Sequence, residues 1–198
     1  MIITERGMIV PDKSEIIINE NELALRLGMK RGADLSCVDK CMAEVVSASE
    51  PRACFVRCKI SVSGNICRLG FAEVKCRLLA KNLSGCTEMF AFAATLGAAV
   101  DRLIARKEAL SPTELFIADA VASAYMEALA DCVNNRLGKG QSCRPRFSPG
   151  FGGFGLSYQQ PLIDFLSAQK LLGIKLTESR MMLPVKSVTA VIGIGEDD

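Results

Sequence analysis

The segment from Arg144 to Gly155 carries the clearest chemical signal in the chain. It reads Arg-Pro-Arg-Phe-Ser-Pro-Gly-Phe-Gly-Gly-Phe-Gly. Glycine lets a ligand approach the backbone closely, so that backbone N–H groups can contact it. Arg146 can pair with a carboxylate through two parallel hydrogen bonds. The segment therefore indicates either a ligand-binding loop or a tight structural corner with a surface arginine. It is neither a Walker A motif nor a dinucleotide fingerprint, because the spacing of its glycines differs and no Gly-Lys-Ser/Thr follows.

Two glutamates and a group of aromatic residues suggest recognition of a cation. Glu127 and Glu178 each offer a carboxylate that can bind an ammonium or sulfonium group, although a solvated carboxylate is the more common role. The aromatic residues can form an apolar wall or a cation–π face for a sulfonium, or can belong to the core. These aromatic residues are Phe147, Phe151, Phe154 and Tyr158.

Nine cysteines raise the question of a metal site: Cys37, Cys41, Cys54, Cys58, Cys67, Cys76, Cys86, Cys132 and Cys143. Four thiolates can hold zinc or an iron–sulfur cluster, but the paired C-x2-C spacing of structural zinc sites is missing. Free cysteine otherwise behaves as a small buried hydrophobe. We expect no metal ligands, and keep a cysteine-based metal or redox protein as a third alternative.

Several residue types are missing, which excludes whole classes of chemistry. The 198 residues include no histidine and no tryptophan. Histidine-dependent triads, histidine metal ligands and a histidine general base are therefore ruled out, and we assign no catalytic residue. The net charge is +2 without a long basic stretch, so nucleic acid is not an expected partner. No signal peptide and no apolar run of 18 residues is visible, so we expect no membrane span and a location in the reducing cytosol.

The order of predicted elements mixes strands and helices without a regular βαβ rhythm, which favours an α+β fold. We expect residues 1–50 to form an N-terminal cap, helical with a short strand at 15–19, and residues 51–198 to form the α+β core as one compact unit with the cap. The core strands are expected at 53–62, 66–71, 89–95, 174–177 and 187–194. Helices are expected at about 21–27, 34–46, 78–83, 98–106, 112–137 and 161–172.

The helix from 112 to 137 is the best-defined element. Ser111 stands at its N-cap, Pro112 at its first position and Glu114 at its third, which is a capping box. Gly138 ends it. Its predicted buried stripe comprises Ala118, Val121, Ala122, Tyr125, Leu129, Cys132 and Val133.

Spaced motifs in the C-terminal half resemble a known family. These motifs are Arg146 to Phe151, a helix that begins near Pro161, Gly173 to Ser179, Met182 to Pro184 and Ser187 to Ala190. In this order they resemble the S-adenosylmethionine-binding activation domain of cobalamin-dependent methionine synthase, in its stand-alone bacterial form. Upstream, Ala94 to Gly97 and Ala118 to Ala120 are also similar. The resemblance covers residues 87–195 well and implies a twisted antiparallel sheet flanked by helices.

The resemblance also implies roles for individual residues. Arg146 matches the arginine that grips the methionine carboxylate, and Ser148 and Gly150 match positions of backbone contact with the ligand. Phe151 stands where the family has tyrosine. Ser123 aligns with a glutamate of the helix that contacts the ligand, and Glu127 lies one turn later.

The function implied is that of an activation subunit. Such a subunit binds S-adenosylmethionine and supports reductive remethylation of cob(II)alamin, while the cobalamin is held by a partner protein. The partner would be a cobalamin-binding methionine synthase or a related corrinoid methyltransferase, with a flavodoxin-like electron donor. The alternative is a non-catalytic binding module of the same fold that has lost S-adenosylmethionine and binds a corrinoid protein or another small ligand.

Overall fold

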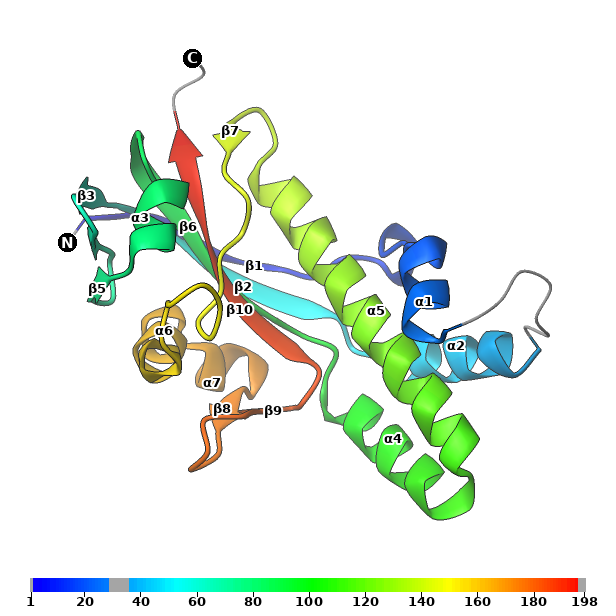
Figure 1. The fold of residues 1–198 in the computed structure, drawn as a ribbon. Helices are drawn as coiled ribbons and strands as arrows, with labels where there is room; N and C mark the ends of the chain where they lie inside the picture. The colour runs from blue at the N-terminus through cyan, green and yellow to red at the C-terminus, as the bar shows by residue number, and fades with distance from the viewer. Residues whose placement is uncertain (1, 29–35, 196–198) are drawn as a thin grey trace.

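A five-stranded antiparallel sheet forms the centre of the protein, whose computed structural model describes residues 2–28 and 36–195. The strand order is β1-β2-β6-β10-β7, which Figure 1 shows with β10 in red beside β6. The strands are β1 (Ile3–Ile9), β2 (Arg52–Lys59), β6 (Cys86–Thr95), β10 (Ser187–Gly195) and the short β7 (Ser142–Cys143). The α+β fold with a flanked antiparallel sheet is confirmed.

Side chains alternate between two hydrophobic cores because successive residues of a strand point to opposite faces. On β6, Phe90 and Phe92 belong to one core, whereas Met89 and Ala91 belong to the other. The strands at the centre of the sheet are thus buried on both faces, which explains why β6 reads as an unbroken apolar run.

Four helices cover the first face: α1 (Glu20–Arg26), α2 (Ser36–Ala48), α4 (Ala98–Leu110) and α5 (Pro112–Leu137). The capping box at the start of α5 is confirmed on its serine side, since Ser111 Oγ accepts a hydrogen bond from the Glu114 N–H at 3.3 Å. The predicted stripe of α5 is buried except for Cys132, which is half-buried. Ala124, Met126, Ala128, Ala130 and Leu137 are buried as well, because α5 contacts helices as well as the sheet.

Three short helices and two small sheets lie on the second face. The helices are α3 (Arg77–Asn82), α6 (Gln159–Leu166) and α7 (Ala168–Leu172), with a short 3₁₀ turn at Leu156–Tyr158 before α6. One small sheet contains β3 (Ser61–Ser63), β4 (Ile66–Arg68) and β5 (Glu73–Lys75). The other is the hairpin of β8 (Lys175–Leu176) and β9 (Met182–Leu183).

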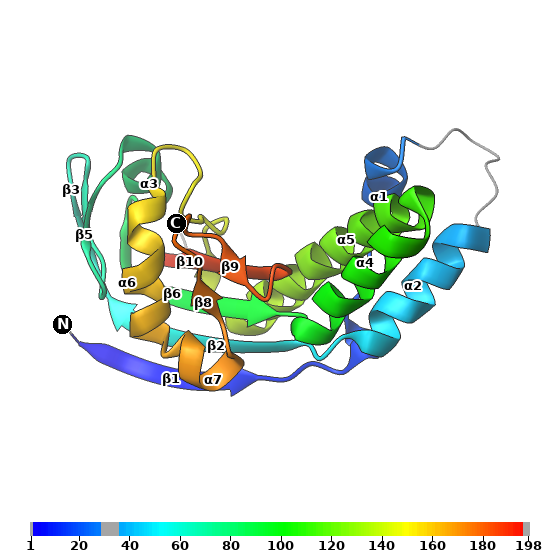
Figure 2. The same ribbon diagram turned by 90° about the horizontal axis from the view of Figure 1, so that it is seen from below.

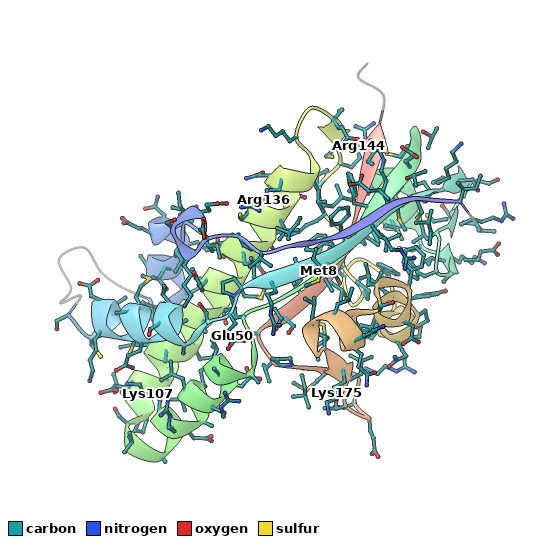
Figure 3. All side chains as sticks on the ribbon, turned by 180° about the vertical axis from the view of Figure 1, so that it is seen from behind. Met8, Glu50, Lys107, Arg136, Arg144 and Lys175 are labelled. Carbon is teal, nitrogen blue, oxygen red and sulfur yellow. The ribbon has the colours of Figure 1, made fainter. Side chains whose placement is uncertain are left out.

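The two sets of helices stand on either side of β10. Figure 2 shows α6, α3 and the β8–β9 hairpin on one side, and α4 and α5 on the other, with β10 between them. β1 lies at one edge of the sheet, beside β2, and Figure 3 labels its Met8.

Two sequence predictions at the N-terminal end need correction. The strand predicted at 15–19 is absent: Lys13–Glu15 is a 3₁₀ turn, and Ile16 is buried among the helices without a strand partner. The actual strand is β1, whose pairing with β2 brings the first residues into the central sheet. It lacks a clear apolar pattern because an edge strand exposes most of its side chains. The predicted start of the second helix, at 34, lies outside the described residues.

The helix predicted at 161–172 is in fact two helices. Ser167 adopts a left-handed conformation with φ 53° and separates α6 from α7. Phe165 of α6 is only partly buried. Within residues 2–28 and 36–195, none of the helices combines the length and apolar character needed to cross a membrane.

Candidate functional site

Four polar residues form a row along α5 on the side that faces β10 and the glycine-rich loop. Asp119, Ser123, Glu127 and Asp131 follow one another at intervals of four residues. Side chains four residues apart lie on the same face of a helix, about one turn from each other. We call these four residues the α5 row.

Arg146 reaches the C-terminal half of this row. Its Nη2 donates to Glu127 Oε2 at 2.6 Å, and its Nη1 donates to Asp131 Oδ1. The side chain of Arg146 keeps 25% of its surface exposed, against 45% for Glu127 and 63% for Asp131. The structure thus brings together two residues singled out in the sequence, Arg146 and Glu127.

The electrostatics of this group favour a guanidinium that stays charged. Burial alone would lower the pKa of Arg146, but hydrogen bonds and charge from Asp131, and then from Glu127, outweigh it and raise the pKa. One cation between two carboxylates leaves an excess of one negative charge. Such a group can offer an acceptor to an ammonium and a donor to a carboxylate within a few ångströms.

Lys186 reaches the other half of the row. Its Nζ donates to Asp119 Oδ1 at 2.7 Å and to Ser123 Oγ at 2.9 Å. Its side chain is 10% exposed. Ser123 therefore hydrogen-bonds to Lys186, the residue directly before β10, and also to the Asp119 carbonyl of its own helix. Lys186, Asp119 and Asp131 were not predicted as site residues from the sequence. The four-residue spacing of the row within the well-defined predicted helix could have indicated the two aspartates.

The course of the chain next to β10 explains how Arg146 is positioned. Phe147 pairs with Val191 of β10 through two backbone hydrogen bonds of 2.9 Å, so the chain is locally extended there. Neighbouring side chains of an extended segment point to opposite sides. Arg146 consequently faces α5, while Phe147 packs into the core on the second face.

The glycine-rich loop is built by glycine conformations that other residues avoid. Gly150, Gly152 and Gly153 have φ values of 95°, 57° and 85°. The Gly150 N–H donates to the Phe154 carbonyl at 2.6 Å, and the Phe151 N–H donates to the Ser148 carbonyl at 3.2 Å. These two N–H groups are therefore engaged within the loop. In Figure 1 the loop (yellow) runs beside β10 on its way from β7 to α6.

The other predicted site residues lie apart from Arg146's carboxylate partners. Phe151 is 65% exposed at the tip of the loop, with its ring centroid 5.3 Å from that of Phe147. Glu178 is exposed in the turn between β8 and β9 and makes no contact that places it with Arg146. Tyr158 stacks on Phe154, with ring centroids 5.6 Å apart, and Phe154 belongs to the core.

Five exposed apolar side chains lie on the glycine-rich loop, on the turn that follows it, and on the β8–β9 hairpin and its flanks. The loop contributes Phe151 and Leu156, and the β8–β9 hairpin and its flanks contribute Met181, Leu183 and Val185. Gln159 connects the two segments, since its Nε2 contacts Met182 Sδ at 3.4 Å and donates to Thr189 Oγ1 at 2.7 Å. We call these five apolar residues the apolar rim.

The cysteines are scattered through both cores. In the described part of the chain, no group of three or more histidine, cysteine, aspartate or glutamate residues is arranged to hold a metal ion. All nine thiols are free. Burial raises the pKa of the Cys54 thiol to about 12, which keeps it protonated and unreactive.

A separate charged cluster lies at the opposite end of α5. Lys107 of α4 is buried and contacts Glu44 at 2.6 Å and Glu114 at 2.5 Å, beside a hollow of about 610 Å³ between α2 and α4. The 13 residues from Glu114 to Glu127 place this cluster about 20 Å from Arg146's partner along the helix. Figure 3 shows Lys107 and Arg144 at opposite ends of the molecule. The cluster joins three helices and is not part of the α5 row.

Comparison with solved structures shows a likeness of fold. The chain superposes on a solved structure described as the MetH reactivation domain bound to AdoHcy, with a TM-score of 0.74 and 16% sequence identity. The match covers 98% of this chain and 79% of that chain. No family model and no curated protein matches the sequence. The chain therefore has the fold of a methionine synthase reactivation domain.

Proposed function

We propose that this protein is an activation subunit that holds S-adenosylmethionine for the methylation of a corrinoid on a partner protein. The observation that carries the proposal is the pairing of Arg146 with Glu127 and Asp131 beside the glycine-rich loop, in a chain with the fold of a domain whose structure contains AdoHcy. AdoHcy and S-adenosylmethionine share an α-amino carboxylate. Arg146 would bind that carboxylate, and the nearby carboxylates would bind the ammonium.

The α5 row gives the ligand a direction. With its amino acid end at Arg146, the ligand would extend along β10, where Lys186 and Ser123 mark the far half of the row. The sulfonium would lie close to Glu127, whose carboxylate balances its charge.

The apolar rim is the surface we propose for the partner. Its five exposed residues belong to the glycine-rich loop, the 3₁₀ turn that follows it and the segment from Met181 to Val185. Exposed apolar residues that gather on a protein surface are typical of interaction sites. The partner's corrinoid supplies the reduced cobalt that accepts the methyl group, with an electron from a separate, flavodoxin-like donor. This chain binds and orients the methyl donor.

Calorimetric titration with S-adenosylmethionine tests the proposal, using the native chain, Arg146→Ala and Arg144→Ala. Loss of a charge-assisted contact costs about 1.5–3 kcal/mol, which corresponds to about 10- to 150-fold weaker binding by Arg146→Ala. Arg144→Ala is the matched control, because Arg144 lies two residues away and its side chain hydrogen-bonds to the Ser84 carbonyl instead of the α5 row. Equal affinities of the native chain and Arg146→Ala would refute the role of Arg146.

The alternative, a binding module without S-adenosylmethionine, has two observations in its favour. Arg146 is already paired with two carboxylates, and Phe151 lacks the hydroxyl of the tyrosine that the resemblance implies at its position. Under this alternative the titration releases no heat, and a different small molecule copurifies with the protein. Mass spectrometry of the native extract identifies that molecule.

A further inference from the structure

Asp131 occupies a place on Arg146 that the carboxylate of a ligand needs. We infer that Asp131 competes with the ligand's carboxylate for Arg146. It thereby sets the affinity of the proposed ligand site and its selectivity between ligands with and without a carboxylate. This inference rests on the proposed function, because the proposed ligand bears a carboxylate.

The geometry of the guanidinium creates the competition. A carboxylate binds arginine best through two parallel hydrogen bonds from neighbouring nitrogen atoms. Both Nη atoms of Arg146 are engaged, Nη2 with Glu127 and Nη1 with Asp131. A ligand whose two carboxylate oxygens take the N–H groups that these bonds use has to displace one of these protein carboxylates.

Exposure decides which carboxylate leaves. Asp131 is the more exposed of the two, and its only ion pair among the described residues is with Arg146. An exposed ion pair contributes little to stability, so Asp131 can be displaced at small cost. Glu127 then stays in place between the guanidinium and the ligand's ammonium.

Charge predicts opposite effects on two related ligands. Once displaced, Asp131 still lies beside the incoming carboxylate and repels it, so that removing its charge strengthens the binding of S-adenosylmethionine. Decarboxylated S-adenosylmethionine has the same sulfonium and amine but no carboxylate. It does not compete for Arg146, and the negative charge of Asp131 attracts it.

The experiment compares native chain, Asp131→Asn and Asp164→Asn by calorimetric titration with both ligands. Asp164 is a matched control, since it is an exposed aspartate of α6, on the second face of the sheet, and is bonded only to Gln160. We expect Asp131→Asn to bind S-adenosylmethionine about two- to fivefold more tightly, the range for an exposed ion pair, and the decarboxylated ligand no more tightly than the native chain does.

The outcomes separate this inference from the proposed function. If the native chain binds S-adenosylmethionine and Asp131→Asn binds it no better, the inference is wrong and the proposed function stands. An equal gain for both ligands also contradicts the inference, since it would reflect a general effect. If neither the native chain nor either variant binds S-adenosylmethionine, both fail. Circular dichroism of Asp131→Asn checks that the helix is intact.

Discussion

Replacing Gly152 by alanine tests whether the glycine-rich loop has to be built as the structure shows. A Cβ atom at this position would lie 2.8 Å from Phe147 Cζ and 3.2 Å from Leu78 Cδ1. Phe147 cannot simply move aside, because its ring packs against those of Phe151 and Phe154, and its backbone is bonded to β10. The added methyl group therefore has to displace the residue that follows Arg146.

The expected loss in the free energy of unfolding has two contributions. A left-handed conformation costs a residue with a side chain about 1–2 kcal/mol relative to glycine. Overpacking a well-filled core costs a further 1–3 kcal/mol, roughly. We expect Gly152→Ala to lower the free energy of unfolding by about 2–5 kcal/mol, the sum of these two parts, and to weaken S-adenosylmethionine binding because Arg146 is displaced with Phe147.

Gly64→Ala separates the cost of the left-handed conformation from the cost of overpacking. Gly64 has φ 58°, almost the same as the 57° of Gly152, but no atom lies within 4 Å of its added Cβ. Urea denaturation of the native chain and both variants measures the difference. If the two variants lose the same free energy of unfolding within about 0.5 kcal/mol, the usual uncertainty of independent substitutions, the packing of Phe147 against Gly152 is not as tight as we argue.

Two further predictions concern stability. Ser111→Ala removes the side chain that caps α5 and should lower the free energy of unfolding by about 1 kcal/mol; Ser157→Ala, a serine that caps no helix, is the control in the same urea denaturation, and an equal loss in both would contradict the capping role. Cys54 should make the native protein less stable in alkali: burial raises its pKa to about 12, so the unfolded chain loses the thiol proton near pH 8.5 while the native chain keeps it. The stability that this proton linkage contributes is complete below pH 8.5 and falls by up to about 1.4 kcal/mol per pH unit as the pH rises towards 12. Comparing native chain and Cys54→Ala in urea at pH 8 and pH 10.5 measures it, and a free-energy difference between them that does not shrink at the higher pH would contradict the assignment.

The order of elements and their faces followed from local patterns in the sequence. The sequence predicted a strand at 53–62, and the structure has β2 at Arg52–Lys59 with Cys54, Val56 and Cys58 in one core. The capping box at Ser111 predicted the start of the long helix, and Gly138 its end. Both signals depend only on residues within one turn or one strand, which is why sequence alone suffices for them.

The edge strand and the broken helix did not follow from the sequence. β1 exposes Thr4, Glu5 and Arg6, so it becomes a strand only through its hydrogen bonds to β2, fifty residues away. The break at Ser167 separates two helical segments whose buried residues, Leu166 and Ala168, belong to the same core. The packing of these segments on the sheet determines both features, and no local sequence pattern predicts that packing.

The same distinction between local sequence patterns and tertiary packing applies to the candidate site. The sequence by itself singled out Arg146 from its glycine-rich surroundings and Glu127 from its place on the helix, because residue type and local spacing carry their chemistry. Only the tertiary structure decided that Arg146 bonds to Glu127 and Asp131, and that Lys186 donates a hydrogen bond to Ser123. It also places Glu178 in the turn between β8 and β9, apart from Arg146. The reason is that these contacts join α5 to residues on β10 and its neighbouring loop, and such distances are fixed by the packing of the helix on the sheet rather than by spacing along the chain.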